Sequence, residues 1–165
     1  MLLRAIDTVT AWTGRLLARL AVPMVLFVFA NVVLRYVFGL GYVWMYEIVG
    51  YCFAILLTGL AGWALQTDEH VRVDVVYAAL GERWRGLIDL LGALLLLAPF
   101  PWIMWDRGLP YVARSWRFRE GSVELSGLPF VWLLKTFMLV FVVVLAVAGV
   151  AFAIRAALRL MGRTT

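Results

Sequence analysis

The chain has 165 residues, of which 65% are hydrophobic and only 15% charged, whereas soluble domains are about half apolar and about a quarter charged. This composition argues against a water-soluble enzyme. The sequence contains four separate apolar stretches, each long enough to cross about 30 Å of hydrocarbon at about 1.5 Å per residue. We therefore predict an all-α integral membrane protein with four transmembrane helices in a single domain.

Charge and ligand counts exclude further classes. The net charge is +5, but the fourteen Arg and one Lys are spread around the ends of the apolar stretches, which indicates membrane-flanking anchors rather than a nucleic-acid surface. The chain has one His and one Cys, too few for a zinc, bis-haem, iron–sulfur or dithiol site of its own. No nucleophile–base pair or phosphate-binding loop is apparent. We expect no cofactor, no metal and no catalysis in this chain.

The first 18 residues place apolar side chains near one helical face and Arg4, Arg15 and Arg19 toward another. This pattern predicts an interfacial helix over residues 1–18 that leads into a first span, about residues 20–38. A signal peptide is the alternative, because Val28-Phe29-Ala30 fits a cleavage site. Cleavage there would remove the first helix of an otherwise regular hairpin, so we favour the span.

A short glycine-containing turn, Gly39-Leu40-Gly41, leads to a second span, about residues 42–65. The two spans therefore form a helical hairpin. Aromatic residues gather at this turn, as expected where rings lie at the depth of the lipid headgroups. They are Tyr36, Phe38, Tyr42, Trp44 and Tyr46.

The polar segment Gln66 to Arg85 follows the second span. Its alternating valines mimic a strand, but an isolated strand would leave its backbone unpaired. We predict a short interfacial helix instead, from about Asp74 to Gly81. His70 and Asp74 would lie one turn apart on such a helix. A hydrogen-bonded His that fixes the loop is favoured over a pH sensor or a metal ligand.

The third predicted span is about residues 86–105, with Pro99 and Pro101 in its last third. These prolines predict a kink or an early end. The longest connection then runs from Asp106 to Gly127, and a fourth span covers about residues 129–154, with Pro129 in its first turn.

An even number of spans places both termini on one side of the membrane. With the termini in the cytoplasm, nine basic residues lie inside and six outside. The positive-inside rule therefore favours cytoplasmic termini.

Polar residues inside membrane spans are costly and are candidates for function. The candidates are Asn31, Arg35, Glu47 and Lys135, with Asp89 as a further carboxylate near a span entrance. Arg35 follows Asn31 by one turn and Glu47 lies just across the short turn, so we predict an Arg35–Glu47 pair. A structural clamp is favoured over a proton or ion relay. Lys135 lies one to two turns inside the fourth span and can snorkel outward.

Small residues recur every fourth position after Glu47 in the second span. Such spacing allows close approach of helix backbones, either within this chain or against another subunit. The positions are Gly50, Ala54, Thr58 and Gly62, and a similar set in the fourth span is Gly149, Ala153 and Ala157.

Three motifs carry a resemblance to a known family. They are Asn31 to Gly39 (NVVLRYVFG), Trp44 with Glu47, and His70 to Asp74 (HVRVD). The first and last resemble the N-x-x-x-R-Y and H-x-x-x-D signatures of the small permease subunit of tripartite ATP-independent periplasmic (TRAP) transporters, the DctQ type. The order of the motifs, the four spans and the length also fit.

A second block is similar to the subgroup that takes up mannitol, chloroaromatic acids and 2-oxo acids. It comprises Ser115-Trp116, then Glu120-Gly121-Ser122 with Glu124, then Gly127-Leu128-Pro129 with Lys135 six residues on. That subgroup more often has Pro-Gly-Gly before Leu-Pro, where this chain has Leu125-Ser126-Gly127.

The resemblance implies a multi-pass protein of the bacterial inner membrane that works in a complex. A periplasmic binding protein (DctP type) captures an organic acid, and a large permease (DctM type) moves it using a sodium gradient. The small subunit scaffolds the permease, contacts lipid and contributes to the docking surface. Residues proposed for docking are Arg114, Arg117, Arg119 and Glu124.

Two other classes stay open at this point. An autonomous proton-coupled exporter would use Glu47, although a midplane site is expected for that role. A membrane anchor of a redox enzyme would need two haem-ligating His, and this chain has one.

Overall fold

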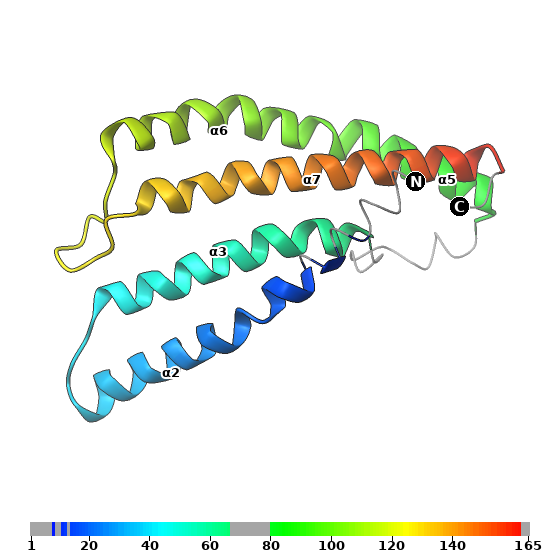
Figure 1. Ribbon diagram of the computed structural model, residues 1–165. Coiled ribbons are helices and arrows are strands. Elements are labelled where there is room, and N and C mark those ends of the chain that lie inside the picture. The colour runs from blue at the N-terminus through cyan, green and yellow to red at the C-terminus, as the bar shows by residue number, and fades with distance from the viewer. Residues whose placement is uncertain (1–7, 9–10, 13, 67–79, 163–165) are drawn as a thin grey trace.

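The computed structural model describes residues 8, 11–12, 14–66 and 80–162, with only the backbone path described for 62–66. The elements are α2 (Ala21–Val37), α3 (Val43–Gln66), α5 (Glu82–Gly92), the π-helical segment η1 (Ala93–Leu97), α6 (Pro99–Phe118) and α7 (Val131–Leu160) (Figure 1). Four helical stretches of the described chain are long and apolar enough to cross a membrane. The prediction of an all-α membrane protein with four such helices is confirmed.

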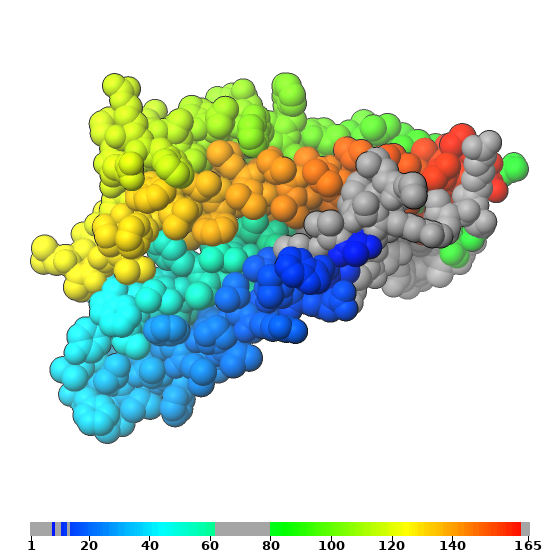
Figure 2. Space-filling model, viewed as in Figure 1, coloured from blue at the N-terminus to red at the C-terminus, as the bar shows by residue number. Residues whose placement is uncertain are grey.

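The helices lie in a row rather than in a closed bundle. α3 packs between α2 and α7, and α7 packs between α3 and the continuous α5–η1–α6 segment. Figure 2 places α2 and α6 on opposite sides of the molecule. In α2 only Asn31 is buried. Such a row has no enclosed interior, so most apolar side chains face lipid or a partner.

Residues with small side chains bring α7 close to its neighbours. Its buried positions include Ala148, Ala151 and Ala156. A Cβ atom added at Gly149 would lie 3.0 Å from Leu97 Cδ2. The small-residue pattern predicted for the fourth span therefore serves contacts inside this chain at Gly149.

A polar bridge joins α3 to α7 at Thr58. Thr58 Oγ1 donates to the carbonyl oxygen of Ala54 at 2.6 Å and lies 3.3 Å from that of Phe137. Thr58 is buried, whereas Gly50, from the same predicted stripe, has nothing within 4 Å of an added Cβ. Gly59 of α3 is tightly packed, because an added Cβ would overlap the Leu17 side chain. The surroundings of Gly62 lie outside the described side chains.

The third predicted span was expected to end at residue 105, but the helix continues to Phe118. The helical segment from Glu82 to Phe118 is 37 residues long. The helix widens into η1 just before Pro99, where Ala98 N donates to Ala93 O at 2.8 Å, five residues back. This wider turn accommodates the proline, which lacks an N–H and crowds the preceding turn. The predicted connection 106–127 is therefore shortened to residues 119–130.

Other boundaries differ by smaller amounts. Gly39 has φ of +68°, and the N–H of Leu40 donates to Leu34 O at 2.9 Å, which closes α2 as predicted for a glycine turn. Residues 14–18 are helical and a turn at 19–20 precedes α2. α7 begins at Val131 and ends at Leu160, later at both ends than predicted. Most of the predicted interfacial helix 1–18 lies outside the described residues, as do His70, Asp74 and most of the second interfacial helix.

Candidate functional site

The α2–α3 turn and residues 119–130 lie at the same end of the row, which we call the loop end (Figure 1). Residues 119–130 fold back compactly. Ser122 N donates to Leu128 O at 3.0 Å, and Gly127 N donates to Glu124 O at 3.1 Å. Trp132 N, at the start of α7, lies 3.3 Å from its acceptor Glu120 O. The connection is therefore an ordered structure attached to α7.

Glu47 at the start of α3 holds this connection. Its Oε1 accepts a hydrogen bond from Ser122 Oγ, and its Oε2 accepts one from Leu128 N at 2.5 Å. A Cβ atom at Gly127 would lie 2.7 Å from Glu47 Oε1 and would overlap the Ser122 hydroxyl. Only glycine allows this close approach. Glu47 thus ties α3 to a loop 75 or more residues away in sequence.

The predicted Arg35–Glu47 pair does not form. Arg35 is exposed in the last turn of α2, and both carboxylate oxygens of Glu47 are bonded to the loop. The prediction relied on proximity across the short turn. The structural clamp exists, but it joins α3 to residues 122 and 128 instead of α2 to α3.

Lys135 makes an ion pair rather than snorkelling to open solvent. Its Nζ lies 2.6 Å from Glu120 Oε2 and 4.1 Å from the centroid of the Tyr111 ring. The Lys135 side chain is only 16% exposed. Its ammonium group holds the pKa of the Glu120 carboxyl below its usual value. The ammonium therefore contacts the loop and α6 at once.

Aromatic contacts complete the corner between α6 and α7. Trp116 Nε1 donates to Thr136 Oγ1 at 2.8 Å, and that hydroxyl donates to Trp132 O at 2.8 Å. The Trp116 and Trp132 rings meet edge to face, with centroids 4.4 Å apart. The Arg119 guanidinium lies 5.4 Å from the Trp132 ring centroid. This corner is a rigid support for the loop.

The proposed docking residues occupy different settings. Arg114 and Arg117 are exposed on α6, and Glu124 is exposed on the loop. Arg119 ends α6 in a left-handed conformation with φ of 47° and packs on Trp132. Arg119 is therefore a structural residue as well as a surface cation.

Sequence reasoning missed the apolar tip of the loop. Val123 and Leu125 flank Glu124 and are 100% and 110% exposed. Single apolar residues in a short polar segment give no periodic signal. Sequence reasoning also assigned no role to Ser122 or Gly127, although both belong to the block that resembles the transporter subgroup. The glycine at position 127 was the available signal, because glycine is often found where the chain passes close to another group.

The opposite end of the row has its own polar contact. Asp89 of α5 is buried, and its Oδ2 lies 3.4 Å from Arg159 Nη1 of α7. Asp89 was noted in the sequence only as a carboxylate near a span entrance. The contact pins the ends of α5 and α7 together.

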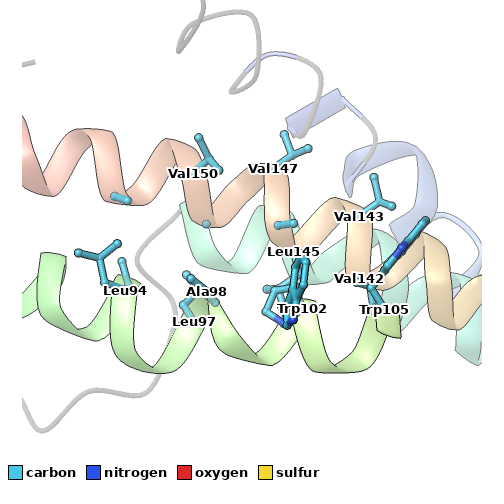
Figure 3. A pocket seen from close by; sticks show the side chains of 15 residues that line it. Leu94, Leu97, Ala98, Trp102, Trp105, Val142, Val143, Leu145, Val147 and Val150 are labelled. Carbon is cyan, nitrogen blue, oxygen red and sulfur yellow. The ribbon is translucent and has the colours of Figure 1, made fainter. Parts of the chain in front are cut away.

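An apolar groove of about 550 Å³ lies between the η1–α6 segment and α7 (Figure 3). Trp102 and Trp105 line it from α6, and Val143, Val147 and Val150 line it from α7. The groove adjoins the close contact of Gly149 with Leu97. It offers apolar contacts and no charged side chain.

Trp44 is partly exposed at the start of α3, with its ring centroid 6.1 Å from that of Tyr42. Within the described residues, no three His, Cys, Asp or Glu side chains are placed to hold a metal ion. The bonded groups at the loop end join helices to a loop. Their arrangement suits a mechanical role, holding a surface in a fixed shape.

A family model described as "Tripartite ATP-independent periplasmic transporters, DctQ component" matches residues 24–160. No curated protein and no solved structure matches the sequence. The matched range includes all four long helices from the first turn of α2 to the end of α7.

Proposed function

Because the chain belongs to the DctQ component family of tripartite ATP-independent periplasmic transporters, we propose that it scaffolds the large permease of a sodium-coupled organic-acid importer. The family and the four apolar helices make it a multi-pass inner-membrane subunit of such a transporter. The scaffold role, the sodium coupling and the acid substrate, a 2-oxo acid or a similar carboxylate, are our proposals.

The single-row arrangement is the observation that supports a scaffold. A transporter that works alone needs polar groups gathered around an enclosed path. In this chain α3 and α7 form the middle of a flat row, and large apolar side chains are exposed on both edge helices. Glu47, which an exporter would use, is occupied by Ser122 and Leu128. A flat apolar surface is suited to packing against another membrane protein.

Co-expression with a large permease of the DctM type tests the scaffold proposal. We expect the two chains to purify together in detergent and the complex to take up substrate when its binding protein is added. We expect this chain alone in liposomes to transport nothing. Recovery of the two chains only as separate species would contradict the proposal, and so would transport by this chain alone.

The loop end is proposed to face the periplasm, with both termini in the cytoplasm. Arg114 and Arg117 on α6 and the apolar tip around Glu124 would then be available to the binding protein. Charged and apolar groups side by side suit a transient protein contact, because the charges steer encounter and the apolar residues add affinity.

Reversing charge at the docking surface should weaken uptake without dissociating the complex. For Arg114→Glu with Arg117→Glu, we expect a several-fold lower rate at limiting binding protein and a smaller deficit at saturating binding protein, since rim charges act mainly on association. Arg83→Glu, exposed on α5 at the opposite end of the row, is the matched control. An unchanged dependence on binding-protein concentration would rule out this contact.

A further inference from the structure

A small hollow of about 170 Å³ lies between α2 and α3 near the loop end. The residues that line it from α2 are three or four positions apart in sequence, so they lie on the one face of α2 that is turned toward α3. Its α3 side comes from the first two turns. The lining residues are Val28, Asn31, Val32, Arg35 and Tyr36 of α2 and Tyr46 and Val49 of α3.

Two strongly polar side chains of α2 line this hollow, Asn31 and Arg35. Asn31 is only 6% exposed and its side chain lines the hollow. Arg35 pairs with no acidic group in the described ranges, since Glu47 is bound to the loop. An arginine near the end of a membrane helix with no carboxylate partner is free to pair with an anion at headgroup depth. The hollow therefore offers hydrogen-bond donors to a ligand that accepts them.

These two side chains define the chemistry of that ligand. A guanidinium group offers only donors, in a fork that fits the oxygens of a phosphate or carboxylate. The amide of Asn31 and the hydroxyls of Tyr36 and Tyr46 can add further donors. The carboxyl end of α2 does not itself attract anions, so recognition depends on the charge of Arg35.

The position of the hollow distinguishes a lipid from a free anion. Arg35 lies two residues before the end of α2, amid exposed aromatic rings, including Tyr36, Tyr42 and Trp44, that are typical of headgroup depth. Below the polar groups the lining is apolar, from Val28, Val32 and Val49. Polar donors above an apolar wall match a phosphate followed by an acyl chain.

We propose that the hollow between α2 and α3 binds a phospholipid whose phosphodiester is held by Arg35 and Asn31, with an acyl chain along Val28, Val32 and Val49. No carboxylate neutralises Arg35 in the described structure, so the site favours an anionic lipid. This proposal concerns the isolated chain and does not depend on the proposed transport function.

Native mass spectrometry of the purified, delipidated chain with dioleoylphosphatidylglycerol tests the site. We expect Arg35→Gln to weaken retention of the first lipid about tenfold, the loss expected for charge-assisted hydrogen bonds to one cation. Asn31→Leu should weaken it less. Arg117→Gln is the matched control, because Arg117 also lies in the last turn of a membrane helix at the loop end. Equal retention by Arg35→Gln and Arg117→Gln would overturn the proposal.

Two further experiments distinguish a lipid phosphate from a free phosphate ion and from a carboxylate of a partner protein. Inorganic phosphate at millimolar concentration should fail to displace the lipid, because it lacks the chain that contacts the valines. Displacement by phosphate alone would indicate a simple anion site and overturn the lipid assignment. If Arg35→Gln leaves lipid retention intact but releases a co-expressed permease, Arg35 pairs with a protein carboxylate and the proposal is wrong.

Discussion

Replacing Glu47 with leucine is expected to release the 119–130 connection from α3. The substitution leaves the Leu128 N–H and the Ser122 hydroxyl without their acceptor, and each unsatisfied group costs about 1–3 kcal/mol. We expect a lower midpoint of thermal unfolding in detergent and faster trypsin cleavage after Arg119.

Glu47→Gln is the control that separates charge from hydrogen bonding. The glutamine carbonyl can accept from Leu128 N, and its amide can donate to a rotated Ser122 hydroxyl. We expect Glu47→Gln to protect Arg119 nearly as well as the native residue does. If glutamine and leucine open the loop equally, the charge is essential; if neither opens it, Glu47 does not hold the connection.

Replacing Gly86 with alanine should separate α5 from α7. An added Cβ would lie 2.9 Å from Leu160 N and 3.0 Å from Ala156 O. Both are backbone atoms, so no side-chain rotation relieves the clash, and overpacking of this kind costs about 1–3 kcal/mol. The shift should also weaken the nearby contact of Asp89 with Arg159.

Gly92→Ala on the same helix is the matched control, because nothing lies within 4 Å of an added Cβ there. Alanine also favours helix over glycine, so Gly92→Ala should leave the unfolding midpoint unchanged or raise it. The measurement is thermal unfolding in detergent, followed by the fluorescence of the 8 tryptophans. Equal midpoints for the two variants would contradict the close approach at Gly86.

The fold was predictable wherever a local pattern decides it. Hydrophobic length located four spans, and the glycine at position 39 located the first turn. The rule that proline ends a helix failed at Pro99, because a π-helical turn made room for the ring. That rule considers only the local turn around the proline. It does not include the contacts between α6 and α7, which stabilise the helix beyond Pro99.

The site was less predictable because its contacts are long-range. Glu47 was correctly selected as a costly polar residue, but its partner Ser122 is 75 positions away. The nearer Arg35 was chosen because sequence proximity was the only guide. Lys135 was selected for the same reason as Glu47, and its pairing with Glu120 depends on the fold of the loop.

The length of the α5–η1–α6 segment has a consequence for the surrounding bilayer. Its 37 residues extend about 55 Å, whereas hydrocarbon is about 30 Å thick. Asp106 and Arg107 lie on its surface with side chains 70% and 86% exposed. Charges this exposed are costly in hydrocarbon, so this face of α6 requires water, lipid headgroups or a partner subunit beside Asp106 and Arg107.

The opposite edge keeps its apolar surface farther toward the loop end. Gly108 of α6 faces Met138 of α7, and the adjacent Phe137 meets Thr58 of α3. From Thr58, α3 continues 15 residues to Val43, about 22 Å. The α2–α3 hairpin therefore extends well beyond these charges toward the loop end. A hydrocarbon layer of uniform thickness would not match both edges of the row.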